Sequence, residues 1–98
     1  MMNSSLCGYI EKESNVNSIV IAQYDNTSNL IYKGHVTLGI SSEALKIIKS
    51  QKKLDYNLFE AKENVIWIEP TLVCTIKYMY KNENGSLRQP VFRGLRLD

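Results

Sequence analysis

The 98-residue sequence is poor in the residues that often stabilise or equip small proteins. Its two cysteines, Cys7 and Cys74, are far apart and have no nearby histidine, which excludes a dense disulfide framework and a zinc site. We expect both thiols to be reduced and buried as small hydrophobic groups. The only histidine, His35, has no Ser or Cys nucleophile pattern around it. We therefore expect a structural or surface histidine rather than a member of a catalytic triad.

Other absences restrict the function further. Neither of the glycine-rich phosphate-binding motifs, Gly-x-x-x-x-Gly-Lys-Ser/Thr and Gly-x-Gly-x-x-Gly, occurs, and the acidic residues lack the spacing of a metal site. No apolar run approaches the ~20 residues of a membrane span, and residues 1–7 lack the features of a signal peptide. The chain is therefore poorly equipped as an autonomous catalyst. We expect a cytoplasmic domain with no membrane partner and no metal ligands.

The length and the amino-acid composition of the chain indicate one small folded domain. Hydrophobic residues make up 44% of the chain, enough for a modest core that leaves little room for a deep pocket, so we expect function on a face or groove. The formal charge of +2 is unevenly distributed. Residues 1–76 carry seven basic and eight acidic side chains, whereas residues 77–98 carry five basic and two acidic ones, a net of +3. The positive charge is concentrated in the C-terminal segment.

Three segments in the first half predict a meander of antiparallel strands. They are residues 7–10, 18–24 and 30–38, which are apolar or β-branched and are separated by polar turn residues. Gly34, inside the third segment, indicates a bulge, a bend or a close approach of backbone.

Over residues 41–54 the hydrophobic residues recur with a period of 3.6 residues, which predicts one amphipathic helix. Ser41 or Ser42 can cap it, and Glu43 lies in the first turn, where the helix dipole favours an anion. The predicted apolar stripe consists of Ala44, Leu45, Ile47 and Ile48. Lys49, Lys52 and Lys53 fall in the last turns, and we interpret them as a solvated helix end rather than a binding patch.

Two further strands are predicted in the second half, over residues 71–80 and 87–93, with a turn at residues 82–85. Pro90 indicates that the last strand lies on a sheet edge. The residues predicted to face the core are Leu72, Cys74, Ile76, Tyr78 and Tyr80. The chain is thus expected to be all-β with one helix, a five-stranded Greek-key OB-fold barrel whose amphipathic helix lies between strands 3 and 4. The same periodicity also allows a helix packed on an open antiparallel sheet.

Arg88, Arg93 and Arg96 lie close together in the basic C-terminal segment. Guanidinium groups bind phosphate oxygens bidentately and stay charged at physiological pH, so the pattern suits a triphosphate or a nucleic-acid backbone. The alternative is an exposed, solubilising tail.

Two runs in this half resemble a known family. Trp67-x-x-Pro70-x-x-Val73 precedes Gly85-Ser86-Leu87-Arg88-x-Pro90-x-Phe92-x-Gly94-x-Arg96-x-Asp98. Together they resemble the C-terminal OB domain of ATP-dependent DNA ligases, and most of all the bacterial ligases of the end-joining type. Gly8-Tyr9 and Tyr32-x-Gly34-x-Val36-x-x-Gly39 are also similar to that family. The resemblance covers nearly the whole chain.

The resemblance implies that residues 1–98 are a single OB-fold domain of a longer ligase chain, monomeric when isolated and not catalytic alone. The adenylated lysine would belong to a nucleotidyltransferase domain that binds ATP with Mg²⁺, since this sequence has no Lys-x-Asp-Gly motif. Arg96 and Asp98 would assist catalysis. Arg88 and Arg96 would bind the β and γ phosphates of ATP and orient them for departure as pyrophosphate. Thr75 stands where the family often has an acidic residue.

Nicked duplex DNA is the other implied partner. From their charge and position, Lys33, Lys77 and Arg93 are candidate contacts with the DNA backbone. Trp67, Tyr32 and Phe92 have rings that could stack on bases, but we expect all three in the core.

Two other hypotheses fit the same fold. A free-standing OB module could bind single-stranded nucleic acid by aromatic stacking. An OB domain of an RNA-capping enzyme or an RNA ligase would share the C-terminal motif, although the run Arg-x-Pro-x-Phe-x-Gly-x-Arg-x-Asp favours a DNA ligase.

Overall fold

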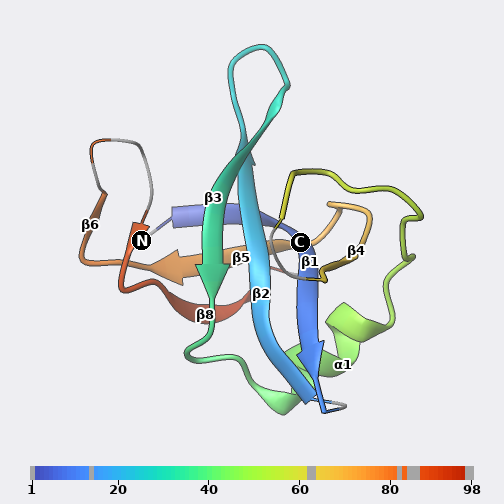
Figure 1. The fold of residues 1–98 in the computed structure, drawn as a ribbon. Coiled ribbons are helices and arrows are strands. Elements are labelled where there is room, and N and C mark those ends of the chain that lie inside the picture. Colours follow the sequence, from blue (N-terminus) through green and yellow to red (C-terminus); the bar gives the residue numbers. More distant parts are fainter. Residues whose placement is uncertain (1, 14, 62–63, 82, 84–86, 97–98) are drawn as a thin grey trace.

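The structure is a computed structural model that describes residues 2–13, 15–61, 64–81, 83 and 87–96. These residues form eight strands and one helix (Figure 1). In chain order they are β1 (Met2–Lys12), β2 (Asn15–Tyr24), β3 (Leu30–Val36), α1 (Ser42–Lys49), β4 (Ile66–Trp67), β5 (Val73–Lys77), β6 (Tyr80–Lys81), β7 (Leu87–Arg88) and β8 (Val91–Arg96). The helix follows the third strand, as predicted.

Five strands make up the barrel, in the order β3-β2-β1-β5-β8, and every neighbouring pair in this order is antiparallel. The two outer strands meet through a parallel bridge between Leu38, just after β3, and Val91 at the start of β8. This bridge closes the sheet on itself, which rules out the open-sheet alternative. The OB-fold barrel with one helix is thereby confirmed.

β1 is longer than the predicted strand over residues 7–10, because its first residues pair with a distant part of the chain. Residues 2–5 pair with β5, while Ser5 to Lys12 pair with β2. The β1–β2 pairing has a register shift between Leu6 and Gly8, which separates the residues of β1 that also pair with β5 from those that also pair with β4. A Cβ at Gly8 would lie 2.8 Å from the Ile66 carbonyl oxygen, so glycine here allows β4 to approach.

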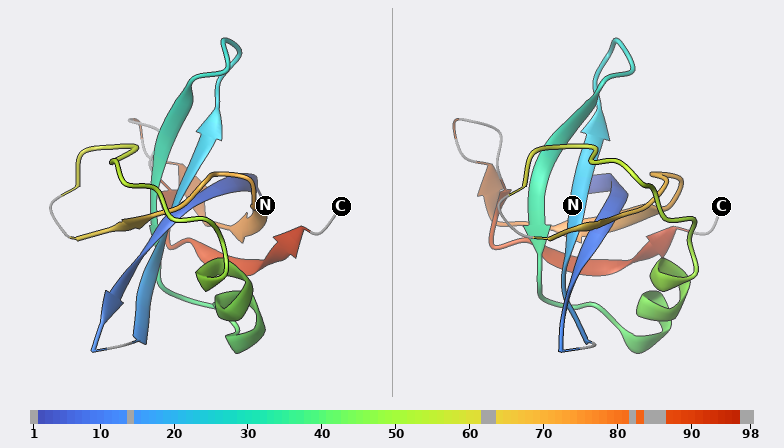
Figure 2. Two further views of the ribbon diagram at one scale, coloured as in Figure 1. Left: turned by 90° about the vertical axis from the view of Figure 1, so that its right-hand side faces the viewer. Right: turned by 45° about the vertical axis from the view of Figure 1, so that its right-hand side comes forward.

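The predicted bulge at Gly34 is confirmed. Ile21 pairs with Gly34 but Ala22 pairs with Tyr32, so Lys33 is the extra residue of β3. Gly34 has a φ of +126°, which favours glycine. The β2–β3 hairpin continues past the bulge and projects beyond the barrel in both views of Figure 2.

The core has two parts, one inside the barrel and one outside it. The outer part consists of Cys7, Val20, Ala22 and Trp67, packed against partly buried Leu54, Leu58 and Phe59 from the connection between α1 and β4. This connection covers the outer face of β1 and β2, so residues 19–22 are completely buried on both faces. The inner part consists of Met2, Leu6, Tyr9, Ile19, Ile21, Val36, Ala44, Ile48, Ile68, Cys74, Ile76 and Phe92.

The helix starts as predicted and ends earlier. The Ala44 amide donates to the Ser41 side chain at 3.1 Å, which caps the N-terminus, and Ser50 ends the helix. Lys52 and Lys53 therefore lie beyond the helix, because the chain turns there to pair Lys53 with Ile68. Lys49 and Lys52 pair with Glu11 and Glu69 at 3.3 and 3.6 Å. Ion pairs at the protein surface suit a solvated helix end, as interpreted from the sequence.

The predicted strand over residues 87–93 is wrong, because two strands replace it. Gln89, with a φ of +49°, and Pro90 separate β7 from β8. β7 pairs with β6 in a small hairpin, whereas β8 pairs with β5. Pro90 therefore marks a break between strands and not a position within an edge strand. The predicted turn at residues 82–85 lies largely outside the described residues, as does Ser86.

The alternation predicted over residues 71–80 is confirmed in and around β5, although β5 ends at Lys77 and Tyr80 belongs to β6, with its side chain outside what the structure describes. Cys74 and Ile76 of β5 are buried in the inner core, and Leu72 and Tyr78 pack against it. Thr75 and Lys77 consequently face outward. The helix in the described part of the chain is neither long nor apolar enough to cross a membrane.

Candidate functional site

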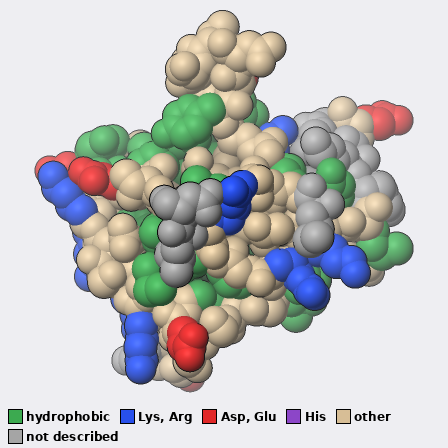
Figure 3. Space-filling model, turned by 180° about the vertical axis from the view of Figure 1, so that it is seen from behind, with side chains coloured by type: hydrophobic (Ala, Val, Ile, Leu, Met, Phe, Trp, Pro, Cys, Tyr) green, Lys and Arg blue, Asp and Glu red, His purple; other side chains and the backbone are tan. Residues whose placement is uncertain are grey.

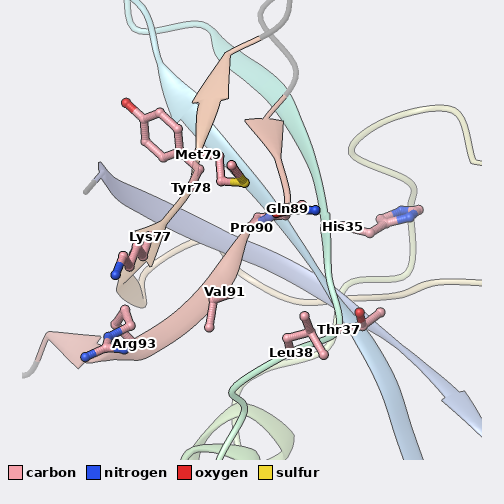
Figure 4. Close-up of a pocket in the computed structure, with 10 residues that line it drawn as sticks. All are labelled: His35, Thr37, Leu38, Lys77, Tyr78, Met79, Gln89, Pro90, Val91 and Arg93. Atoms are coloured by element: carbon pink, nitrogen blue, oxygen red, sulfur yellow. The ribbon is translucent and has the colours of Figure 1, made fainter.

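A groove opens on the surface where β3 diverges from β5 and β8 (Figure 4). It has a volume of about 640 Å³. The closing bridge between Leu38 and Val91 lies within its lining, so the groove follows directly from the way the barrel closes. Its lining residues are His35, Thr37, Leu38, Lys77, Tyr78, Met79, Gln89, Pro90, Val91 and Arg93.

Lys77 and Arg93, both predicted DNA contacts, are brought together at this groove. Lys77 pairs in register with Val91, and Arg93 follows two residues later on the same strand. Both side chains are exposed, and they lie on the same side of the groove in Figure 4. Two neighbouring cations beside an open groove form a suitable site for a phosphate group or another anion.

The opposite part of the groove is more apolar. Leu38 and Met79 are 59% and 69% exposed, although both are large hydrophobic residues. Tyr78 is half-buried and packs against the inner core. The groove can therefore contact the apolar faces of a sugar or base as well as a charged group. From sequence alone, Leu38 and Met79 were missed, since each looked like an ordinary strand residue.

His35 lines the groove, but its ring points away from the basic residues (Figure 4). The ring packs edge-on against Tyr32 with centroids 5.8 Å apart, and Tyr32 packs on Phe59 at 5.7 Å. The described residues include no group of three His, Cys, Asp or Glu side chains that could hold a metal ion. His35 is thus a surface residue in an aromatic contact, as expected.

The structure confirms the core prediction for two of the three aromatic residues. Trp67 and Phe92 are buried, which removes them as stacking platforms. The prediction is wrong for Tyr32, which is 44% exposed because it lies on the projecting hairpin. Burial of its remaining surface raises the pKa of the Tyr32 phenol above its ordinary value of 10.0.

Arg88 and Arg96 lie on different strands rather than beside each other. Arg88 belongs to β7 and pairs with Tyr80, whereas Arg96 ends β8 and pairs with Val73. Gln89, Pro90 and the first five residues of β8 separate the two arginines along the chain. Both arginines are exposed. Asp98, the other predicted catalytic residue, lies outside the described residues.

Lys33, the third predicted DNA contact, lies apart from Lys77 and Arg93. It is the extra residue of the β3 bulge, is half-buried, and is not part of the groove lining.

Figure 3 shows the molecule from behind. Lys and Arg side chains lie on this face, and the acidic side chains lie toward its outline.

The barrel, with one helix after its third strand, is the architecture of an OB-fold domain. The family model for the ATP dependent DNA ligase C terminal region matches residues 12–98. The chain belongs to this family.

Two solved structures have the same fold. The crystal structure of the ligase domain from M. tuberculosis LigD matches with a TM-score of 0.78 and 22% identity, and covers 96% of this chain. The mycobacterial DNA ligase D complexed with ATP and MES matches with a TM-score of 0.77 and 23% identity over 98% of this chain. In both cases the match covers 34% of the other chain, so this sequence spans about a third of their length. No curated protein matches the sequence.

Proposed function

We propose that this chain is the OB domain of an ATP-dependent DNA ligase and that it acts together with a nucleotidyltransferase domain. The two domains would form the lysyl adenylate and then hold nicked duplex DNA for sealing. Membership of the ligase family and the match to about a third of two ligase structures support this division of labour. The observation that carries the proposal is the pair Lys77 and Arg93 beside the groove, in a chain of that family.

The chain's own residues suit a helper in adenylylation rather than the nucleophile. It contains no Lys-x-Asp-Gly motif, so the lysine that attacks the α-phosphate belongs to the other domain. ATP contributes the adenylyl group and pyrophosphate as the leaving group. Transfer of this kind depends mainly on positioning and on compensation of negative charge. An exposed arginine at the end of β8 supplies charge that does not titrate.

In this proposal Arg96 contacts the β and γ phosphates of ATP and Asp98 assists it. Arg88, on β7, contacts the same triphosphate at a different phosphate group. The described residues offer no carboxylate cluster for Mg²⁺, so the metal would be held by the nucleotidyltransferase domain. Among the described residues, the proposed contacts with ATP are the cations Arg88 and Arg96.

Lys77, Arg93 and Lys33 are proposed to contact the DNA backbone. A ligase must accept any sequence, and contacts with phosphates provide affinity without sequence preference. Loss of one phosphate contact should reduce the slope of log affinity against log salt by about 1.

The adenylylation role is tested by mixing the 98-residue chain with a ligase nucleotidyltransferase fragment and ATP. Lysyl adenylate should increase when the chain is added, and Arg96→Ala should abolish most of the increase. Lys46→Ala, an exposed cation on α1, is the matched control and should have no effect. An equal yield with and without the chain contradicts this role.

Binding to DNA is measured separately with nicked duplex and with single strands of the same sequence. Lys77→Ala and Arg93→Ala should each weaken duplex binding about fivefold or more and lower the salt dependence. Tighter binding to the single strand, weakened by Tyr32→Ala, would instead identify a single-strand binding module.

A further inference from the structure

The outer face of β1, β5 and β8 carries a row of three residues that the function above does not use. Asn3 of β1 pairs with Thr75 of β5, and Thr75 pairs with Gly94 of β8. The Thr75 hydroxyl donates a hydrogen bond of 3.2 Å to the Asn3 side-chain oxygen. The Gln23 side chain holds the Asn3 carbonyl at 2.8 Å. Both the backbone and the side chain of Asn3 are therefore fixed in position.

A second bulge opens space at one end of this row. Thr75 pairs with Gly94 but Ile76 pairs with Phe92, so Arg93 is the extra residue of β8. Gly94 has a φ of +152°, and no atom of the described residues lies within 4 Å of the position where its Cβ would be. Bulges redirect side chains, and a glycine beside open space lets a ligand approach the backbone. Arg93 and Arg96 lie on either side of this opening, and both are exposed.

The charged side chains of β5, β8 and residues 2–10 of β1 have one sign. Neither β5 nor β8 contains an Asp or a Glu, and residues 2–10 of β1 contain none. Lys77, Arg93 and Arg96 are the charged residues of β5 and β8. The first acidic residue of β1, Glu11, pairs with Lys49 on α1. The charges of these strands therefore favour an anion near Gly94.

Asn3 adds neutral donors to this positive surface. Its side-chain oxygen accepts from Thr75, so the Nδ2 amide group is the part that can donate to a ligand. The side chain is exposed, and the described residues include no acceptor for Nδ2. An amide held in register with the segment of β8 that carries two arginines suits recognition of a tetrahedral oxyanion.

We propose that Asn3, Gly94, Arg93 and Arg96 form a phosphate-binding site, in which Thr75 is a positioning residue that orients the Asn3 amide. The site rests on the proposed function, and it adds recognition of a phosphate by residues of β1 and β5. The phosphate can come from two sources, the β and γ groups of ATP or the DNA backbone. Both present the same oxygen acceptors to the amide and the guanidinium groups.

The test uses the 98-residue chain with two probes, inorganic tripolyphosphate and a nicked DNA duplex. Asn3→Asp replaces the donating amide with a carboxylate at an exposed position, and binding of the probe that occupies the site should weaken about tenfold or more. Asn17→Asp makes the same charge change at an exposed position of β2, and should weaken binding much less. Equal losses in the two variants would mean that only net charge matters, and would overturn the site.

The positioning role of Thr75 needs a separate pair of variants. Thr75→Val removes the hydroxyl at nearly constant volume and should weaken the same probe several-fold, whereas Thr75→Ser keeps the hydroxyl and should restore binding. If the Thr75→Val and Thr75→Ser variants bind the probe equally well, Thr75 does not orient Asn3. Thermal unfolding of each variant verifies that the fold is retained.

The two probes separate the sources and the two proposals. If Asn3→Asp weakens binding of tripolyphosphate alone, the site is assigned to the nucleotide. If it weakens binding of the duplex alone, the site is assigned to DNA. If Asn3→Asp affects neither probe while Arg93→Ala weakens duplex binding, the site is wrong and the DNA-binding role stands. If Arg96→Ala leaves lysyl adenylate unchanged while Asn3→Asp weakens duplex binding, the adenylylation role fails and the site stands.

Discussion

The Leu38 carbonyl oxygen accepts a hydrogen bond of 2.8 Å from the Phe92 amide, and this bond joins the two edge strands of the barrel. It lies beside the parallel bridge between Leu38 and Val91. The groove opens directly next to this closure, so the residues that close the barrel also determine the shape of the candidate site.

Replacement of Gly39 should disrupt this closure. Gly39 has a φ of +86°, and a Cβ there would collide with the Phe92 carbonyl oxygen. Gly39→Ala should lower the free energy of unfolding by more than the ~1–3 kcal/mol expected from backbone strain alone. Gly34→Ala is the control, because its φ of +126° is also unfavourable but no atom lies within 4 Å. Equal losses in urea unfolding would show that the collision is relieved at no cost.

Removal of the Ser4 hydroxyl should stabilise the protein. Ser4 Oγ is buried and has no hydrogen-bond partner among the described residues. An unsatisfied buried hydroxyl costs ~1–3 kcal/mol, so Ser4→Ala should raise the free energy of unfolding by about 1 kcal/mol. Ser41→Ala removes the cap of α1 and should lower the free energy of unfolding by about 1 kcal/mol. A loss of stability in Ser4→Ala would indicate that its hydroxyl does have a partner.

The two thiols should react only when the protein unfolds. Burial raises the pKa of Cys7 to about 12, and burial together with the nearby Cys7 raises that of Cys74 to about 12. Cys7 packs in the outer core and Cys74 in the inner core, which places them on opposite faces of the sheet. A thiol reagent at pH 8 should label neither cysteine in the native protein and both in urea. Fast labelling of the native protein would contradict this burial.

The same shifts predict a loss of stability at high pH. An unfolded thiol ionises near the ordinary value of 9.0, while the folded thiols stay neutral up to about 12. The stability they contribute is therefore fully present below pH 9 and is lost as the pH rises toward 12. The Cys7→Ala, Cys74→Ala double variant should show a shallower decline between these values in urea unfolding. Part of the decline should remain, because burial also raises the pKa of Tyr9.

Asp25 should hold the tip of the β2–β3 hairpin in one conformation. Its carboxylate accepts from the Asn29 amide at 2.9 Å, and from the Thr27 amide and hydroxyl at 2.8 Å each. These hydrogen bonds lower the pKa of the carboxyl below its ordinary value of 3.8, and the bond from the Asn29 amide has the largest effect. Their stabilising effect is present above that value and is lost as the pH falls through the folded pKa. An NMR titration of the Asp25 carboxyl measures the shift.

Asp25→Ala should accelerate amide hydrogen exchange at Thr27 and Asn29 and leave the exchange of β1 and β5 unchanged. Asn26→Ala, in the same exposed tip, is the control and should have little effect. Faster exchange throughout the barrel would mean that the tip stabilises the whole fold.

The sequence predicts the elements that depend on neighbouring residues. Gly34 signals the bulge because a residue with a positive φ is best supplied by glycine. Ser41 predicts the start of α1 because its side chain can satisfy a free amide of the first turn. The alternation around Cys74 and Ile76 predicts the inner face of β5, since successive side chains of a strand point to opposite sides. The C-terminal motif also identifies the ligase family, through its resemblance to that family's OB domain.

Contacts between distant segments could not be predicted in this way. The pairing of residues 2–5 with β5 extends β1 well beyond its predicted length, because a strand also needs a partner that local sequence does not name. Likewise, Tyr32 is exposed only because the hairpin projects from the barrel, although its sequence context resembles that of a core residue.

By itself, then, the sequence determined the order of strands and helix, the inward-facing residues and the excess of positive charge near the C-terminus, because periodicity, capping and composition are local properties. Tertiary structure alone decided which of those charges act together. It placed Lys77 beside Arg93, put Arg88 and Arg96 on different strands, and brought Asn3 next to Thr75. These neighbours are set by strand register and by bulges, which depend on the closure of the whole barrel.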